Sequence, residues 1–519
     1  MHLSAKCVAA GARGHRTGQM AILLAVAFCV LRPCALVGQA RTASEQMGRV
    51  ERPQAGAHPD SLGALSLEQL MEHFGVPGVS VAVIWDFQIH WAKGYGIADV
   101  ETGAPVTPET LFQAGSISKP VAAMAVLRAV EDGLFGLDDD INDILTSWRL
   151  PDGDFGSAAP VTPRTLTSHT SGLGDGFGYP GYDPDGPIPT IVQSLQGHEL
   201  SNTGPVFRER PPMTFYEYSG GGASLMQLAL SDARGRLFPD LMKEFVLDPI
   251  GMTTSTYEQP LPRQFDSHSA RAHDAEGRSM GAKWHVYPEM AAAGLWTTPT
   301  DLARFAIEIQ ESARGRSNRV LSRAGVQDML TPVGVGPQSI GFWIERRGEG
   351  WYFAHDGSDW GFEALLSAHK VKGYGLVIMT NATRGWELIE ELARRIELSY
   401  DFDARAARVP RTYVAPPADG GLRLSDGQLA AIAGIYEFAA TRIEMVAEDG
   451  RLRFHTFDPT SAPPESGPTE LGAAESPTSF VLSGGRRVRF VLNDRGEVSD
   501  VLIERRGRVI DRGRPMGRE

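Results

Sequence analysis

Apolar residues near the start of the folded part recur first at helical spacing and then in the alternation typical of strands. Residues 66–78, SLEQLMEHFGVPG, carry apolar side chains at intervals that indicate a helix packed on one face. Residues 79–100 then read as two strands around a short turn at Asp86 and Phe87. The pattern predicts a folded domain that begins near Ser61 with a helix and a β-hairpin.

The pattern changes again further along the chain. Helical segments and loops dominate from Leu111 to about Ile309, and strand residues return over residues 341–381, with turn signals at Gly348–Gly350 and Val371–Gly373. Strands at both ends with helices between them predict an α+β domain whose sheet is closed by the two ends. We expect this domain to cover residues 61–402.

Short strands replace the mixed pattern towards the C-terminus. Residues 402–421 are rich in Pro, Ala and Arg, and they predict a linker over residues 403–424. Runs of strand residues separated by turn signals then predict a small β-barrel or sandwich over residues 425–514. The insert at residues 458–478 is poor in apolar residues and is expected to form a mobile loop.

The first forty residues read as an export signal. Basic residues precede the apolar run Met20–Leu31, and the sequence VGQA then ends at Ala40. The run is too short to span a bilayer comfortably, and an uncleaved N-terminal anchor is the alternative. We expect a cleaved signal over residues 1–40 and a flexible tail over residues 41–60. The mature protein is then periplasmic or extracellular, with no stable membrane anchor.

Composition narrows the possible chemistry. The three cysteines, Cys7, Cys29 and Cys34, all lie in the export signal, so the mature chain is expected to have no disulfide, thiolate nucleophile or cysteine metal site. A lipid anchor is disfavoured because small residues do not precede Cys29 or Cys34. Acidic residues outnumber basic ones by 63 to 50, and loss of the four basic residues of the signal leaves 63 against 46. The resulting net charge of −17 disfavours a nucleic-acid partner.

The first candidate for chemistry is LFQAGSISKPVAAMAVLRAVEDG, residues 111–133. Pro120 lacks an N–H and is tolerated only in the first turn of a helix, so the helix begins near Ser116. Free N–H groups and the helix dipole at that end favour a developing oxyanion. Lys119 projects from the same face, and its amine accepts the proton of the Ser116 hydroxyl if burial lowers the pKa of the lysine.

The same spacing also has a purely structural interpretation. A helix-capping serine followed by a solvated lysine is common, and two of the seven lysines in this chain have a serine three residues upstream. The second pair, Ser367 and Lys370, lies in a predicted hairpin with no helix start. Spacing alone therefore leaves both interpretations of Ser116 and Lys119 open.

Six sequence blocks give the first pair its context. In chain order they are LFQAGSISKPVAA, VTPRTLTSHTSGLG, FYEYSGGGASLMQL, FVLDPIGMTTSTY, AAAGLWTTPTDLARF and FAHDGSDWGFEALL. Together they resemble the serine β-lactamase-related family, which unites class C β-lactamases, DD-peptidases, D-aminopeptidases and esterases. The resemblance covers roughly residues 61–400. It implies a β-lactamase/transpeptidase-like fold, with an antiparallel sheet flanked by helices and an all-helical region.

The resemblance also implies roles for individual residues. Ser116 corresponds to the acyl-accepting nucleophile and Lys119 to its partner amine. Tyr218 matches the tyrosine that moves the proton between nucleophile, leaving group and water. Because a tyrosine hydroxyl has a pKa of about 10, this role requires Lys119 to favour the phenolate. The backbone N–H groups of Ser116 and Ser358 would form the oxyanion hole.

The third motif of the family corresponds to HDG, His355–Gly357, on a strand that flanks the site. Two departures from the family pattern affect substrate binding. Gly220 stands where the family usually has an asparagine, whose amide binds the acyl-side carbonyl and helps hold the lysine. His355 stands where the β-lactamases carry a lysine, and it gives at most a partial positive charge for a substrate carboxylate. Both changes weaken the case for efficient β-lactam cleavage and fit the esterases, amidases and peptidases better.

The implied function is an exported serine hydrolase that cleaves a small ester, amide or peptide without a metal or organic cofactor. The competing class is a non-catalytic relative used for binding or assembly, because Gly220 marks a lost substrate contact. Ser116, Lys119 and Tyr218 are all present, which argues against that class. DD-peptidase, D-aminopeptidase and weak β-lactamase activities are the alternatives to esterase activity. The C-terminal β unit resembles the lipocalin-like domain often appended to this family.

Other candidates are weaker. His169, in TSHTSGL, lies in a block that resembles the family but looks structural there. His268 and His273 match no trusted zinc spacing and are expected in a solvated loop. Residues 178–187 hold aromatic residues between turn residues, and they either rim the substrate cleft or form a plain surface loop.

Overall fold

The structure is a computed structural model, and part of the chain is described in it. The described residues are 42–59, 61–153, 159–173, 179–403, 424–437, 442–448, 451–457, 469–470, 474–482, 486–493, 495–505 and 508–516. The predicted export signal, almost all of the predicted linker and most of the insert at residues 458–478 lie outside these residues.

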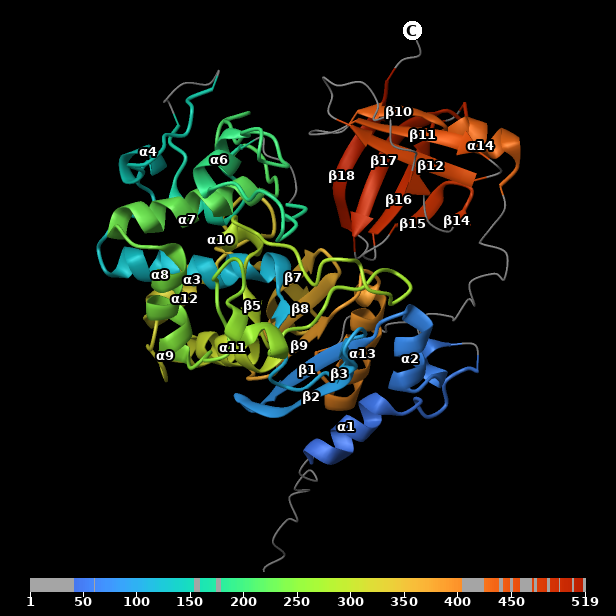
Figure 1. Ribbon diagram of the computed structural model, residues 1–519, viewed down its shortest axis with the longest axis horizontal. Helices are drawn as coiled ribbons and strands as arrows, with labels where there is room; N and C mark the ends of the chain where they lie inside the picture. The colour runs from blue at the N-terminus through green and yellow to red at the C-terminus, as the bar shows by residue number, and fades with distance from the viewer. Residues whose placement is uncertain are drawn as a thin grey trace, which may run out of the picture. The chain divides into compact units, whose positions relative to one another are not determined.

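A seven-stranded antiparallel sheet forms the centre of the part that precedes residue 404 (Figure 1). Its order is β3-β2-β1-β9-β8-β7-β6, so the first and last of its strands along the chain are neighbours, with Val81 opposite Ile378. The prediction of an α+β domain whose sheet is closed by the two ends is confirmed. The strands are β1 (Gly78–Trp85), β2 (Gln88–Asp99), β3 (Ala104–Pro105), β6 (Trp343–Arg347), β7 (Gly350–Asp359), β8 (Phe362–His369) and β9 (Gly375–Thr380).

The predicted first helix and hairpin are both present. Helix α2 (Leu67–Phe74) begins with a capping box at Ser66 and ends at Gly75 in the left-handed conformation. Strands β1 and β2 are joined at Asp86 and Phe87, whose φ angles of 52° and 60° make the tight turn that a hairpin requires.

Both faces of the central strands are buried. In β1, Val81 and Val83 belong to the core that includes helix α13 (Gly385–Tyr400), whereas Ala82 belongs to the core on the opposite face. Helix α11 (Pro299–Ala313) packs against that opposite face. Because successive side chains of a strand point to opposite faces, a strand covered on both sides needs an almost continuous apolar run.

Helix α1 (Ala43–Glu51) lies in the segment for which a flexible tail is expected, residues 41–60. Its buried residues are Gln46, Gly48 and Val50. The fully buried guanidinium of Arg395, on α13, donates hydrogen bonds to the carbonyl of Val50 at 3.1 Å and to that of Leu62 at 2.8 Å. Ala43, Met47 and Val50 also pack against the core that contains α13, so an apolar face at helical spacing and these polar contacts to backbone together hold the segment.

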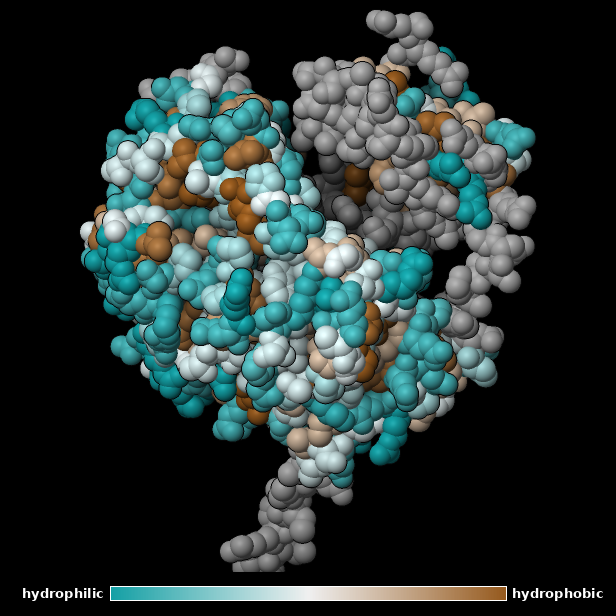
Figure 2. All heavy atoms as spheres, in the orientation of Figure 1, coloured by the Kyte–Doolittle hydropathy of each residue, from teal (hydrophilic) through white to brown (hydrophobic). Residues whose placement is uncertain are grey.

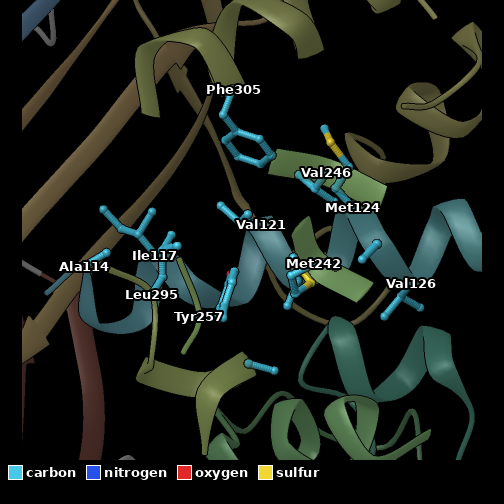
Figure 3. Packing of buried hydrophobic residues seen from close by; sticks show 14 of the residues in the cluster. Ala114, Ile117, Val121, Met124, Val126, Met242, Val246, Tyr257, Leu295 and Phe305 are labelled. Carbon is cyan, nitrogen blue, oxygen red and sulfur yellow. The ribbon is translucent and has the colours of Figure 1, made fainter. Parts of the chain in front are cut away.

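Helix α3 lies at the centre of the helical region. Of its 14 residues, 11 are buried, and it packs against α7, α10 and the π-helical turn η4. Figure 3 shows the side chains of Phe305, Val246 and Tyr257 near the α3 residue Val121. Apolar residues on all sides are typical of a helix that is buried in a core.

The other elements are η1 (Leu62–Ala64), β4 (Phe112–Gln113), η2 (Gly115–Ile117), α3 (Ser118–Glu131), α4 (Ile141–Ile144), α5 (Pro163–Thr167), α6 (Ile191–Gln196), α7 (Gly220–Arg234), α8 (Phe238–Met242), η4 (Lys243–Leu247), α9 (Asp248–Ile250), η5 (Arg263–His268), α10 (Met290–Ala293), β5 (Trp296–Thr297) and α12 (Arg323–Met329).

The C-terminal part forms a second, nine-stranded antiparallel sheet, a half-barrel with the order β13-β12-β11-β10-β18-β17-β16-β15-β14. Tyr436, Phe480, Phe490 and Val501 contribute to its own apolar core. The predicted small β unit is therefore a separate sheet with its own core. Its elements are α14 (Asp426–Ile432), β10 (Gly434–Glu437), β11 (Arg442–Glu448), β12 (Arg451–Phe457), β13 (Thr469–Glu470), β14 (Ala474–Ser476), β15 (Ser479–Leu482), β16 (Arg486–Leu492), β17 (Val498–Arg505) and β18 (Arg508–Pro515).

Hydrophilic side chains cover most of the coloured surface in Figure 2, and apolar ones form small separate patches. Exposed large apolar side chains include Phe207, Met213 and Phe215, in the segment that leads to α7. Among the helices of the described residues, none combines the length and the apolar character needed to cross a bilayer.

Candidate active site

Ser116 lies in the 3-10 turn η2, immediately before α3 begins. Two side chains hold this turn in place. The Ser118 hydroxyl donates to the carbonyl of Gly115 at 2.6 Å and accepts the N–H of Leu295 at 2.9 Å. The N–H of Gly115 donates to Asp359 Oδ2 at 3.0 Å. The serine therefore stands at a helix start, as predicted from Pro120, and is tied to strand β7.

The amine of Lys119 reaches the hydroxyl of Ser116. Lys119 Nζ lies 3.2 Å from Ser116 Oγ and 2.8 Å from the carbonyl oxygen of Ala292. The side chain is almost fully buried, at 6% exposure. The predicted pair is thus brought together, and the carbonyl of Ala292 fixes the direction of the amine.

The contact with Ala292 was not foreseen from the sequence. Ala292 belongs to helix α10, and Gln227 of α7 holds the start of this helix. The Gln227 side chain donates a hydrogen bond to the carbonyl of Pro288 at 2.9 Å and accepts one from the N–H of Ala291 at 3.0 Å. The block AAAGLW pointed to this segment, but a backbone carbonyl as a partner for the lysine leaves no residue-type signal.

Tyr218 lies just before α7, beside the lysine. Lys119 Nζ is 4.9 Å from the centroid of the tyrosine ring. The ring stacks on His169, with centroids 4.3 Å apart and planes 28° apart, and on Trp343, with centroids 6.2 Å apart. These aromatic neighbours fix the plane of the phenol.

His169 is a neutral positioning residue in this arrangement. Its φ of 59° is left-handed, and its Nδ1 accepts the N–H of Ser219 at 3.1 Å. Burial, followed by the charges of Lys119 and His355, holds the pKa of His169 well below 6.5. The structural role expected from the sequence agrees with this, but the stacking on Tyr218 was not predicted.

His355 lies next to Tyr218, with ring centroids 6.3 Å apart. Its ring is 0% exposed and stacks on Trp343, with centroids 4.5 Å apart and planes 26° apart. Its Nδ1 donates to the carbonyl of Asp356 at 2.6 Å, because a carbonyl can only accept. The ring is therefore buried against Trp343, and its contact with a substrate carboxylate stays a prediction.

Two glycines allow the turn η2 and strand β7 to approach each other closely. A Cβ on Gly357 would lie 1.9 Å from the carbonyl oxygen of Ala114 and 3.1 Å from the nitrogen of Ser116. A Cβ on Gly115, whose φ is +53°, would lie 2.5 Å from the nitrogen of Ser358. Neither contact is possible for a residue with a side chain, so the two glycines bring the backbone nitrogens predicted for the oxyanion hole near one another.

The remaining candidates lie apart from this cluster or have other partners. His273 is buried and bonds through Nδ1 to the carbonyl of Asn381 at 2.8 Å, while His268 lies in an exposed turn. Within the described ranges, no group of histidine, cysteine, aspartate or glutamate side chains has the arrangement of a metal site. Gly220 is the first residue of α7, and the ring of Tyr179 lies against it.

Comparison with known proteins places this geometry in a family. The sequence profile of the Beta-lactamase family matches residues 66–400. The chain belongs to the Beta-lactamase family. This Beta-lactamase family protein is 26% identical to penicillin-binding protein 4 of Amycolatopsis lactamdurans over 380 residues, which cover 70% of this chain and 93% of that protein. It is 27% identical to esterase EstB of Burkholderia gladioli over 317 residues, which cover 56% of this chain and 76% of that protein.

Solved structures have the same fold as this Beta-lactamase family protein. SurE with D-Leu has a TM-score of 0.56 and 24% identity, and the match covers 87% of this chain and 97% of that chain. The D-alanine carboxypeptidase AmpC from Burkholderia cenocepacia has a TM-score of 0.53 and 20% identity, with 69% of this chain and 100% of that chain covered. The β-lactamase/transpeptidase-like fold is thereby confirmed, and like its relatives this family member is a serine hydrolase.

Proposed function

We propose that this serine hydrolase forms an acyl-enzyme on Ser116 and cleaves a small ester, amide or peptide. The observation that carries the proposal is the 3.2 Å contact between Lys119 Nζ and Ser116 Oγ at the start of a buried helix. A serine hydroxyl is a weak nucleophile without a neighbouring base, and a buried amine held by the Ala292 carbonyl supplies a proton acceptor at the required distance.

The reaction proceeds in two acyl transfers. Ser116 Oγ attacks the substrate carbonyl while its proton passes to the Lys119 and Tyr218 pair, and the N–H groups of Ser116 and Ser358 stabilise the oxyanion. The carbonyl bond to the leaving group breaks as the leaving group takes up that proton. Water then attacks the acyl-enzyme, gives its proton to the same pair and releases the acid and the free serine.

The preferred bond is an ester or simple amide rather than a β-lactam. Gly220 has no side-chain amide for an acyl-side carbonyl, and His355 stands in the place of a lysine. The similarity to an esterase, EstB, and to the solved D-amino acid amidase from Ochrobactrum anthropi supports this choice. A DD-peptidase or D-aminopeptidase role is the second candidate, which the similarity to penicillin-binding protein 4 favours.

Two further parts of the proposal concern the ends of the chain. Export to the periplasm or the exterior rests on the basic and apolar pattern of residues 1–40, which lie outside the described residues. A lipocalin-like identity for the C-terminal half-barrel rests on its run of short antiparallel strands around one core.

The test is hydrolysis of p-nitrophenyl acetate by the mature protein and by Ser116→Ala. We expect the substitution to lower kcat/KM by at least about 10³-fold, because acylation then lacks its nucleophile. Ser358→Ala is the matched control, since it removes a hydroxyl but keeps the backbone N–H, and it should retain most of the activity. Equal hydrolysis by the wild type and Ser116→Ala would refute the proposal.

A further inference from the structure

An aromatic ring fills the space in which a side chain at position 220 would begin. A Cβ on Gly220 would lie 2.8 Å from Cε2 of Tyr179, 3.4 Å from Cδ2 and 3.6 Å from Cζ. Real Cβ atoms essentially never come nearer than 3.0 Å to another heavy atom, so any side chain at this position must displace the ring. The glycine and the tyrosine are therefore a matched pair.

The Tyr179 ring is fixed along the first turn of α7. Its hydroxyl lies 3.1 Å from the hydroxyl of Ser224, which is itself bonded to the carbonyl of Gly220 at 3.2 Å and is fully buried. The polar end of the tyrosine is thus satisfied one helical turn beyond Gly220. Its ring carbons lie at the start of the helix, two residues after Tyr218.

The residue that follows Tyr179 contacts a second aromatic pair. The carbonyl of Pro180 accepts a hydrogen bond from Nδ1 of His285 at 3.0 Å. The His285 ring stacks on Trp360, with centroids 4.0 Å apart and planes 4° apart, and Trp360 follows Ser358 by two residues along the chain. The residue after Tyr179 is therefore linked through His285 to Trp360, which lies close to Ser358 in the sequence.

We propose that Tyr179 is a specificity-determining residue whose ring lines the acyl side of the site and selects apolar acyl groups. This inference rests on the proposed function. Aromatic carbon gives an extended apolar acyl chain a surface on which to bury itself. Aromatic carbon gives no hydrogen bond to an amide carbonyl next to the scissile bond. Binding such a carbonyl therefore costs free energy, because the carbonyl loses water without gaining a partner. The substrate class is esters or amides of apolar carboxylic acids, rather than acylamino acids.

The first test compares p-nitrophenyl acetate, p-nitrophenyl hexanoate and the p-nitrophenyl ester of N-acetylglycine. We expect Tyr179→Ala to lower kcat/KM for the hexanoate about tenfold and to leave the acetate within about twofold, because the acetyl group is too short to use the ring. Tyr179→Phe is the matched control, since it keeps the ring and should keep the preference for hexanoate. An equal loss on acetate and hexanoate in Tyr179→Ala would overturn the inference.

The second test probes the pairing of the two positions. We expect Gly220→Asn to lower the Tm and the activity on all three esters, because the new side chain collides with the ring. Adding Tyr179→Ala to this variant should restore the Tm. It should also raise kcat/KM for the N-acetylglycine ester relative to that for the hexanoate. Additive effects of the two substitutions on the Tm would contradict the pairing, whether or not the protein is active. Acetate hydrolysis that persists in Ser116→Ala would instead refute the proposed function itself.

Discussion

Two serines of this chain stand three residues before a lysine, and the two pairs behave differently. Lys119 Nζ lies 3.2 Å from Ser116 Oγ. In the second pair, Ser367 Oγ accepts a hydrogen bond from the Arg347 guanidinium at 3.0 Å, and Lys370 Nζ donates to the carbonyl of Leu330 at 2.8 Å. Identical spacing thus gives a serine–amine contact in one region and two separate structural contacts in the other.

The difference comes from the secondary structure around each pair. Three residues of helix advance about 4.5 Å and return to the same face, so two side chains at this spacing meet. Three residues of strand advance about 10 Å and place the side chains on opposite faces. Ser367 lies in β8 and Lys370 just beyond it, so their side chains diverge. A Ser-x-x-Lys tetrad is informative only where the chain is helical.

Substitution of the two lysines tests this comparison with the largest expected effect. We expect Lys119→Ala to lower kcat/KM for p-nitrophenyl acetate by about 10³-fold, because Ser116 loses its proton acceptor. Lys370→Ala should leave the rate within about twofold and cost about 1 kcal/mol of unfolding free energy through its lost hydrogen bond. Steady-state kinetics with a urea titration of each variant gives both quantities. Similar kinetic losses in the two variants would break the comparison.

The second prediction concerns the tyrosine that completes the first pair. Tyr218→Phe keeps the ring and its stacking on His169 but removes the hydroxyl, so we expect about a 10²-fold loss in kcat with little change in Tm. Tyr216→Phe is the control, because the Tyr216 hydroxyl bonds to Gln338 and Trp343. The kcat of Tyr216→Phe should fall by less than about tenfold. Full activity of Tyr218→Phe would exclude the phenol from proton transfer.

The third prediction concerns the close approach of strand β7 to the turn that holds Ser116. Gly357→Ala places a methyl group 1.9 Å from the carbonyl oxygen of Ala114, so strand β7 must move away from Ser116. We expect about a 10²-fold lower kcat/KM and a lower Tm, since the oxyanion hole opens. Gly204→Ala, where nothing lies within 4 Å of the new methyl group, should change neither quantity. Unchanged activity of Gly357→Ala would contradict the assigned backbone geometry.

The smallest effect concerns stability next to Lys370. His369 accepts the N–H groups of Val371 and Lys372 at Nδ1, and burial lowers its pKa from 6.5 to about 4. Between these pH values the unfolded chain binds a proton that the folded chain does not, so the unfolding free energy falls as the pH is lowered. The contribution is at most about 1.4 kcal/mol per pH unit.

Chemical denaturation of His369→Gln between pH 7 and pH 4 measures this contribution. We expect a shallower loss of stability with falling pH than in the wild type. The kinetic parameters for p-nitrophenyl acetate at pH 7 should be the same in both proteins. Identical slopes for His369→Gln and the wild type would contradict the depressed pKa.

The sequence was informative wherever local rules act on neighbouring residues. The proline after Lys119 fixed the helix start, and Asp86 and Phe87 marked the first hairpin correctly. The pairing of Lys119 with the Ala292 carbonyl could not be foreseen, because it joins residues 173 positions apart and uses a backbone atom. Helix α1 was missed for a different reason, because its apolar residues Ala43, Met47 and Val50, although at helical spacing, are few among polar neighbours.

The contacts between aromatic residues around the site could not be predicted from the sequence either. The stacking of His169 on Tyr218 and the contact of the Tyr179 ring with Gly220 depend on loops that bring distant residues together. None of these aromatic residues lies in a periodic pattern of the sequence. The departure at Gly220 was visible as a missing asparagine. Its physical cause, an aromatic ring in the same space, required the structure.

Covalent labelling tests the central claim most directly. The purified protein is treated with a fluorophosphonate and its intact mass is measured, followed by peptide mapping of the adduct. The Ser116→Ala and Ser367→Ala variants are treated in the same way. The account predicts one adduct on Ser116 in the wild type, the same adduct in Ser367→Ala and none in Ser116→Ala. An adduct of equal yield in Ser116→Ala, or one located on Ser367, would contradict the assignment of Ser116 as the nucleophile.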